Sequence, residues 1–212
     1  MNLYYGGVIM ARKVQISKEM ILQAALELLI QEGYSAVNIK TLAKKIGCST
    51  QPIVWQFDNM EGFRKALTEY ALSYANNKMC PSAENAIEAF EQVGIAFLKI
   101  AANESNLFRF LYLDGYSGTC ANNFDALIKD EDNSVLIKRI VEYFQISEES
   151  TGRYLRNTII YTHGIASLVA TGVINASIEE MMLMINSVGD AFLLQAGVPM
   201  HKIPQHIRGE KK

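Results

Sequence analysis

Residues 38–57, NIKTLAKKIGCSTQPIVWQF, decide the fold of this chain, because they read as two short helices joined by a tight turn. Asn38 is a favourable N-cap for a helix. Apolar residues then recur at helical spacing, at Ile39, Leu42, Ala43 and Ile46. The residues between them face water and include Lys40, Lys44 and Lys45. Gly47 follows where a helix needs a left-handed residue after its last turn. The pattern predicts a helix that is apolar on one side, basic on the other, and ends in a turn.

The second helix of this stretch is expected to present polar groups to a partner. Ser49 is its expected cap, and Pro52 is tolerated in its first turn because the first N–H groups of a helix have no intrahelical partner. Ile53 and Phe57 are four residues apart and anchor it to the core, while Cys48 packs inside the turn. The side chains left exposed are suited to contact base edges of DNA: Thr50, Gln51, Val54, Trp55 and Gln56. Two capped helices around a glycine turn also occur in small helical domains of other function.

The flanking residues extend this motif in both directions. Residues 18–31 carry one apolar stripe between a capping Ser17 and Gly33, and Asn59 is the expected cap of a following helix. The whole stretch 18–67 resembles, without a gap, the N-terminal domain of the tetracycline-repressor (TetR) family of bacterial transcriptional regulators. The resemblance rests on Ala24, Ala25, Gly33, Tyr34, Leu42, Ala43, Gly47, Ser49, Phe57 and Glu61. In that family the third helix reads DNA and the start of the fourth touches phosphate. The resemblance therefore implies DNA contacts at Lys40, Ser49, Thr50, Gln51, Pro52, Val54, Trp55 and Gln56.

This chain departs from the family pattern at the end of the reading helix. Most members have Tyr, an aromatic residue and His just before the Phe, whereas residues 54–56 here are Val, Trp and Gln. Met60 stands where members have Lys, and Asp58 adds a negative charge. Phosphate contacts supply much of the affinity for DNA and make it salt-dependent. These changes predict weaker binding, or a larger share of it for Trp55, Gln56, Lys40 and the N-terminal arm.

The charge of the chain is distributed unevenly. Residues 1–65 hold eight Lys or Arg against five acids, a net charge of +3, while the whole chain has −2 and the remainder therefore −5. A basic end suits an anionic partner, although an asymmetry this small is also common by chance. Arg12 and Lys13 belong to an expected flexible arm, residues 1–14, that lies along DNA. The opening MNLYYGGVI fits neither a signal peptide nor a membrane span, and Met10 is a candidate start.

Beyond residue 78 the chain reads as a helical bundle. Pro81 ends the fourth helix and Ser82 is the expected cap of the next. Further helices are expected at 83–102, 106–113, 123–144 with a break near 130–133, 147–171 and 177–195. The predicted fold class is all-α. It comprises a three-helix helix-turn-helix DNA-binding domain at 15–65, a helical-bundle ligand-binding and dimerisation domain at 66–198, and a polar tail at 199–212.

The last two helices are apolar on more than one face. Packing within the bundle explains one face, and the resemblance implies that the second pairs with its copy in a homodimer. The expected interface residues are Ile165, Leu168, Val169, Met184, Val188 and Phe192. A dimer places two recognition helices about 35 Å apart, the spacing that reads a palindrome.

The resemblance also implies a small-molecule pocket among the middle helices. The pair His163-Gly164 looks like a signature of one TetR subgroup. The expected lining residues are Phe97, Phe108, Arg109, Tyr112, Phe124, Tyr143, Asn157, Tyr161 and His163. Aromatic residues at helical spacing are more often core, whereas a polar group on an apolar helix needs a partner, in a pocket or in the dimer interface.

Other functional classes find little support in the sequence. It has no nucleotide-binding glycine loop, nucleophile elbow or HExxH motif. The three cysteines form no CxxC pair, which predicts a reducing cytoplasm and neither a metal site nor a cofactor. For Cys80 and Cys120, inert packing is favoured over a role in sensing oxidants. The predicted function is a homodimeric repressor that a small, largely apolar effector releases from a palindromic operator. The alternative is a TetR-like adaptor or co-activator that is impaired in DNA binding and acts through protein partners.

Overall fold

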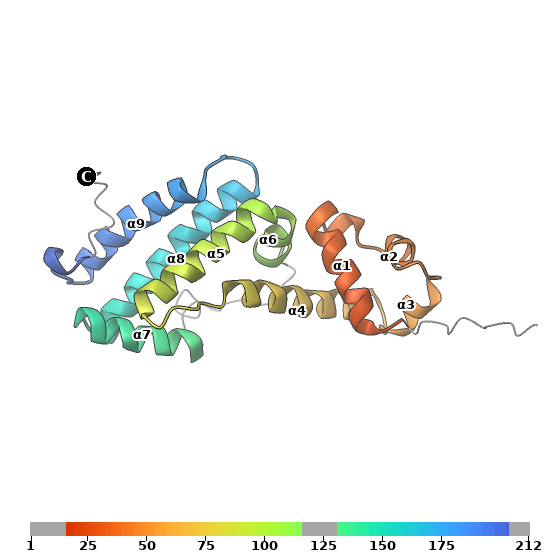
Figure 1. Cartoon of the computed structure of the whole chain (residues 1–212), viewed down its shortest axis with the longest axis horizontal. Coiled ribbons are helices and arrows are strands. Elements are labelled where there is room, and N and C mark those ends of the chain that lie inside the picture. Colours follow the sequence, from red (N-terminus) through yellow and green to blue (C-terminus); the bar gives the residue numbers. More distant parts are fainter. Residues whose placement is uncertain (1–15, 116–130, 204–212) are drawn as a thin grey trace, which may run out of the picture.

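A computed structural model describes residues 16–115 and 131–203, and the regular elements within these ranges are helices. They are α1 (Lys18–Glu32), α2 (Ile39–Ile46), α3 (Gln51–Trp55), α4 (Met60–Met79), α5 (Ala86–Asn103), α6 (Ser105–Tyr112), α7 (Glu131–Phe144), α8 (Glu148–Ala170) and α9 (Ile178–Gln195), with 3-10 turns at Tyr34–Ala36 and Met200–Lys202. Figure 1 shows α1 to α3 gathered at one end, α4 running from that end into the rest of the molecule, and α5 to α9 forming the rest. We call these two parts the head and the body. The expected all-α class is confirmed, and the predicted arm lies outside the described residues.

The caps expected for α1 and α2 are present. The Oγ of Ser17 accepts a hydrogen bond from the N–H of Met20 at 3.2 Å. The Oδ1 of Asn38 accepts from the N–H of Thr41, and the Oγ1 of Thr41 accepts from the N–H of Asn38, each at 3.1 Å. Gly47 ends α2 at φ 75°, in the left-handed region, and its N–H donates to the carbonyl of Ala43 at 3.0 Å. The predicted helix, turn and second helix are therefore formed.

α3 is shorter than the sequence predicts, and its expected cap is wrong. The helix spans only Gln51–Trp55, and its N-cap is Thr50 rather than Ser49. Thr50 has helical dihedrals and makes no capping hydrogen bond, because a side-chain cap requires extended backbone at that position. Ile53 is buried as expected. Phe57 lies beyond the helix end and packs edge-on against Phe63, with ring centroids 5.0 Å apart.

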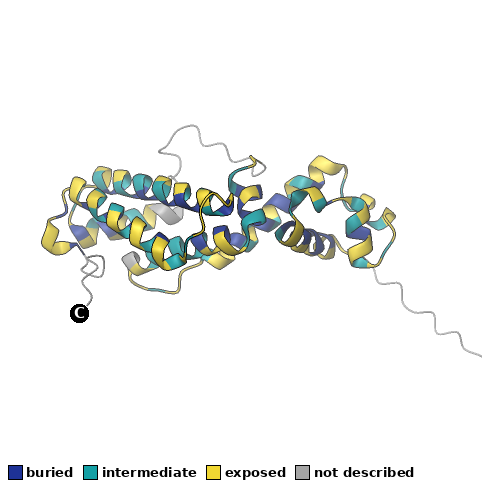
Figure 2. Cartoon of the chain, turned by 90° about the horizontal axis from the view of Figure 1, so that it is seen from above, coloured by how far each residue is buried: buried dark blue, intermediate teal, exposed yellow. Residues whose placement is uncertain are grey.

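α4 belongs to both parts of the molecule. Its cap is Asn59, whose Oδ1 accepts from the N–H of Gly62 at 2.8 Å, and it ends at Met79, ahead of Pro81. Buried residues of α4 join one hydrophobic cluster that extends from α1 and α2 through α6 to α8 and α9. Figure 2 shows buried residues along the narrow junction between the two ends. Head and body therefore share a core.

The start of α5 corrects the prediction for Ser82. The N–H and the hydroxyl of Ser82 both hydrogen-bond to the Oε1 of Gln92, at 2.9 and 3.3 Å. The helix begins only at Ala86, where the Oδ1 of Asn85 accepts from the N–H of Glu88 at 3.3 Å. Asn85 is the capping residue because it, not Ser82, lies three residues before a free helical N–H.

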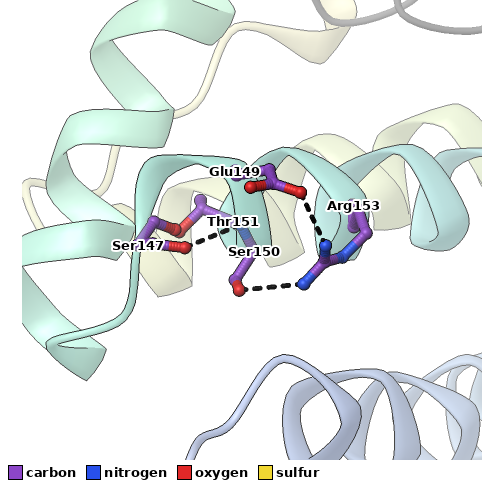
Figure 3. Close-up of polar contacts among 5 residues, drawn as sticks. All are labelled: Ser147, Glu149, Ser150, Thr151 and Arg153. Atoms are coloured by element: carbon purple, nitrogen blue, oxygen red, sulfur yellow. Dashed lines mark hydrogen bonds and ion pairs between the residues drawn. The ribbon is translucent and has the colours of Figure 1, made fainter.

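α8 is the central helix of the body and packs against α5, α6, α7 and α9. Ser147 caps this helix: its Oγ accepts from the N–H of Ser150 at 3.1 Å, and Thr151 donates back to the Ser147 carbonyl (Figure 3). Arg153 forms an ion pair with Glu149 at 2.9 Å one turn along (Figure 3). A capping box of Ser177 and Glu180 begins α9.

A second hydrophobic cluster closes the far end of the body. It joins α7, α8 and α9 through Ile140, Phe144, Leu155 and Leu193, and it includes Val198 and Ile203 after the last helix. The segment predicted as a polar tail from residue 199 thus contributes Ile203 to the core, because the chain turns back at Gly197. Only the second half of the helix predicted at 123–144 is described, as α7.

Candidate functional site

α3 exposes part of the side-chain set predicted to meet DNA. Thr50, Gln51 and Val54 are exposed, and Trp55 is 74% exposed, the largest exposure among the apolar side chains of the described residues. Ser49 is exposed and Pro52 half-buried. On α2, Lys40 and Lys44 are exposed, whereas Lys45 forms an ion pair with Glu27 at 2.9 Å. The head therefore offers hydrogen-bonding groups and a large ring on one helix, with lysines on the helix before it.

Gln56 does not belong to this exposed set. It is half-buried, and its Nε2 donates to the carbonyl of Ile16 at 3.0 Å. The amide therefore ties the chain that precedes α1 to the end of α3. Its partner is 40 residues away, so no local pattern reveals the contact.

The turn between α3 and α4 is apolar. Val54 and Met60 are exposed beside a small groove of about 140 Å³, whose wall also includes Ile53, Phe57 and Phe63. Met60 stands where the resemblance leads us to expect a lysine, so its side chain brings no positive charge to this turn.

The body contains a partly open cavity of about 420 Å³. Four helices line it: α4 through Leu72, α5 through Phe90, Val93, Gly94 and Phe97, α6 through Leu111 and Tyr112, and α8 through Ile159, Thr162 and His163. This volume lies within the range of small-molecule sites, and the mixture of apolar walls with a few polar groups is typical of them. Three of the predicted pocket residues, Phe97, Tyr112 and His163, line this cavity.

Aromatic rings form one wall of the cavity. Phe97 lies 5.2 Å from Tyr112 and 6.0 Å from His163, between ring centroids. Phe108 is fully buried behind them, 5.1 Å from Phe97. Burial lowers the pKa of His163 and raises the pKa of Tyr112, because a charged form loses its hydration there. Both side chains are therefore neutral at pH 7 and act as hydrogen-bonding groups.

The other predicted pocket residues lie elsewhere. Arg109 and Tyr143 are exposed. Tyr161 packs against the shared core, because it is two residues from Ile159 and from His163 and so faces away from them. Asn157 lines a separate cavity of about 250 Å³ with Arg153 and Phe192. Phe124 lies outside the described residues.

The sequence prediction missed most of the cavity wall. Phe90, Val93, Gly94 and Phe97 follow the i, i+3, i+4, i+7 spacing of one helix face, which marks α5 as packed. That spacing does not distinguish a face against side chains from a face against a void. Leu111 and Ile159 carry no signal beyond hydrophobicity.

A second, smaller cavity of about 90 Å³ adjoins the first and shares Phe90, Gly94 and Thr162 with it. Its further lining includes Glu91, Phe144, Tyr154, Thr158, Asn186 and Asp190. Burial, with a contribution from the negative charge of Asp190, raises the pKa of Tyr154 to about 12. Within residues 16–115 and 131–203, no group of three or more His, Cys, Asp or Glu is placed to hold a metal ion.

Apolar side chains cover the outer face of α8 and α9. We define the outer face as Ile160, Gly164, Leu168, Leu183, Met184 and Leu194, all of which are exposed. Of the predicted interface residues, Leu168 and Met184 lie on it, and Val188 and Phe192 are half-buried. Ile165 is only 5% exposed and belongs to the shared core, because it is one residue away from the stripe 160, 164, 168. Val169 also packs against that core.

α6 makes the polar and aromatic contacts between body and head. The Nδ2 of Asn106 donates to the carbonyl of Ile30 in α1 at 3.2 Å. Phe110 packs against Tyr34 with ring centroids 4.9 Å apart. At the other end of the junction, the carboxylate of Glu104 accepts from the hydroxyl of Tyr74 at 3.3 Å and pairs with Lys78, so α4 is tied to the start of α6.

Comparison with known proteins agrees with this arrangement. Residues 21–67 match the family model described as bacterial regulatory proteins, tetR family. No curated protein matches the chain. In the described residues no helix is long and apolar enough to span a membrane.

Solved structures share the fold at low sequence identity. A TetR-like transcriptional regulator from Rhodococcus sp. RHA1 is 14% identical, with a TM-score of 0.58 over 89% of this chain and 99% of that one. TetR from Acinetobacter baumannii AYE is 16% identical, with a TM-score of 0.53 over 85% and 96%. A variant of it in complex with minocycline is 18% identical, with a TM-score of 0.52 over 85% and 96%. Residues 21–67 therefore match the N-terminal domain of the TetR family, and the chain as a whole shares its fold with these TetR-family structures.

Proposed function

We propose that the chain is a homodimeric repressor that holds a palindromic operator through α3 and releases it when a small molecule occupies the body cavity. One observation carries this proposal: the two helices that join head and body also line the cavity. α4 contributes Leu72 to the cavity and Phe63 to the head core. α6 contributes Tyr112 to the cavity and Asn106 to the contact with α1.

Recognition of DNA is assigned to α3 and its neighbours. Thr50 and Gln51 can donate to and accept from base edges, and Trp55 can contact thymine methyl groups. Lys40 and Lys44 are exposed on the preceding helix. In this proposal they meet phosphates, which supply affinity without sequence preference. A protein that binds chromosomal DNA of bacteria works in the cytoplasm.

Dimerisation is assigned to the outer face of α8 and α9. Leu168, Leu183 and Met184 are 43%, 60% and 50% exposed, an unusual concentration of apolar surface on two adjacent helices. A two-fold axis would place the same surface of a second copy against it. The pair of heads would then read two half-sites.

Release requires that the effector bind one arrangement of the heads better than another. A molecule in the cavity contacts Tyr112 and Leu111 and so displaces α6, which holds α1 through Asn106 and Phe110. A minocycline complex of a TetR protein with this fold supports a small-molecule effector in the body.

The test is a mobility-shift and footprinting series on the DNA upstream of the chain's own gene, across salt concentrations. We expect a protected palindrome. Gln51→Ala relaxes sequence preference, and Lys40→Ala weakens binding to all DNA and reduces the salt slope by about one. Lys99→Ala removes the same charge from an exposed position of the body, and it should leave the affinity for DNA and the salt slope unchanged. Absence of specific protection at low salt would refute the repressor.

One observation favours a second candidate, an adaptor that binds a protein through the head. Val54, Trp55 and Met60 are exposed apolar side chains at the end that would meet DNA. If Trp55→Ala abolishes regulation in cells while Gln51→Ala and Lys40→Ala do not, and the purified protein binds no DNA, the adaptor replaces the repressor.

A further inference from the structure

We propose that the effector is an amphipathic cation, with an apolar or aromatic portion in the larger body cavity and a protonated amine or quaternary ammonium group in the smaller one. The inference rests on the proposed function only in taking the body cavities as the effector site. Its starting point is that the two cavities adjoin through Phe90, Gly94 and Thr162 but have walls of different chemistry. From these shared walls we infer that one elongated molecule occupies both cavities.

The larger cavity suits an apolar or aromatic group. Phe97 and Tyr112 form its aromatic wall, with ring centroids 5.2 Å apart. At Gly94 a Cβ atom would meet no other atom within 4 Å, so α5 leaves open space toward the ligand. Aromatic pairs of this kind gain from a further ring at offset or edge-on geometry.

The smaller cavity is acidic. Glu91 from α5 and Asp190 from α9 both line it, and no Lys, Arg or His stands among its described lining residues. Asn186 and Thr158 add neutral hydrogen-bonding groups. Burial is the main cause of the raised pKa of Tyr154, and the negative charge of Asp190 acts in the same direction.

A positive group gains more here than a neutral or negative one. A carboxylate ligand would face two like charges, whereas an ammonium group gains charge-assisted hydrogen bonds. Phe90, Phe144 and Tyr154 also line the smaller cavity and offer aromatic faces to a cation. In the larger cavity the basic side chain is His163, which burial keeps neutral, so it attracts no anion.

The size of the smaller cavity agrees with this assignment. Its volume of about 90 Å³ is several times the roughly 10–15 Å³ that one water molecule requires. It therefore admits an ammonium group with small substituents, while the larger cavity takes the rest of the molecule. The proposal therefore modifies the sequence-based prediction of a largely apolar effector, because it adds a positively charged group at one end of the molecule.

The test uses three probes with one skeleton and different charge: 4-phenylbutylamine, 4-phenylbutan-1-ol and 4-phenylbutyrate. Binding to the purified full-length chain is measured by isothermal titration calorimetry at pH 7, without DNA. We expect the amine to bind tightest. Glu91→Gln and Asp190→Asn each weaken the amine roughly tenfold and leave the alcohol unchanged, as expected for loss of a charged hydrogen-bond partner.

Two further variants complete the experiment. Glu88→Gln removes the same charge at an exposed position of α5 that lines neither cavity, and it should bind all probes like the parent. Gly94→Leu fills the space shared by both cavities and should abolish binding of all three.

The inference is overturned if the alcohol or the butyrate binds as tightly as the amine, if both carboxamide variants retain the parent's amine affinity, or if none of the probes binds. Because the titration contains no DNA, it separates the ligand class from the repressor proposal. If the protein fails to bind an operator but still selects the amine, only the repressor proposal is refuted.

Discussion

Replacing Leu168 by Glu tests whether the outer face of α8 and α9 joins two copies of the chain. Full burial of a Leu side chain stabilises by about 1.5–3 kcal/mol. Leu168 is 43% exposed in one copy, so covering this exposed part in the dimer contributes about 0.6–1.3 kcal/mol to the free energy of association. A two-fold dimer covers it in both copies and gains twice that. Removing both contributions weakens the dimer roughly seven- to seventyfold, at about 1.4 kcal/mol per factor of ten. The two introduced carboxylates add a desolvation cost in the same direction.

The assay is sedimentation velocity over a concentration series, with the midpoint of dissociation as the readout. Val135→Glu is the matched control, because Val135 is also an exposed apolar residue but lies on α7, outside the outer face. We expect Leu168→Glu to shift the midpoint by at least a factor of ten and Val135→Glu to leave it in place. An unchanged midpoint for Leu168→Glu, or a monomeric parent protein, refutes the assignment of this face.

Three further predictions concern stability and coupling. Gln145 has a φ of 58°, so Gln145→Gly should raise the free energy of unfolding by roughly 0.5–1 kcal/mol in urea titrations, while Gln145→Ala should bring no such gain. Asn106→Ala removes the hydrogen bond to the carbonyl of Ile30. The variant should bind the operator within a few-fold of the parent's affinity, but the effector should release it from DNA less effectively. Unchanged release would show that this hydrogen bond does not couple the effector site to DNA binding. Burial depresses the pKa of His163 below its ordinary 6.5, so the folded state binds fewer protons than the unfolded one. The free energy of unfolding should therefore fall as the pH drops through about 6.5. In urea midpoints measured from pH 8 to 5.5, His163→Phe should flatten this pH dependence.

Helix boundaries were largely predictable because their determinants are local. Ser17, Asn38 and Asn59 cap the helices expected of them, each through an N–H two or three residues ahead. Ser49 failed because the preceding turn leaves the next residue already helical, a geometry that depends on how α2 and α3 meet.

The candidate site was only partly predictable, because its geometry depends on distant contacts. Gln56 is withdrawn from the exposed set by a carbonyl at Ile16. Ile165 and Leu168 look alike in the sequence, and only the helices packed on α8 decide which of them faces solvent. The acidic cavity joins Glu91 and Asp190 from helices almost a hundred residues apart, and nothing near either residue indicates the other.

The core shared by head and body limits how this protein can be recombined with its relatives. A chimera joined at residues 65 and 66 would cut α4 within its second turn and present one protein's α6 to another's α1. Phe110 and Asn106 would then meet a foreign partner in place of Tyr34 and the carbonyl of Ile30. DNA specificity alone is better exchanged by grafting the exposed residues of α3 than by swapping the head. In natural divergence, likewise, the residues of head and body that meet at this junction must change together.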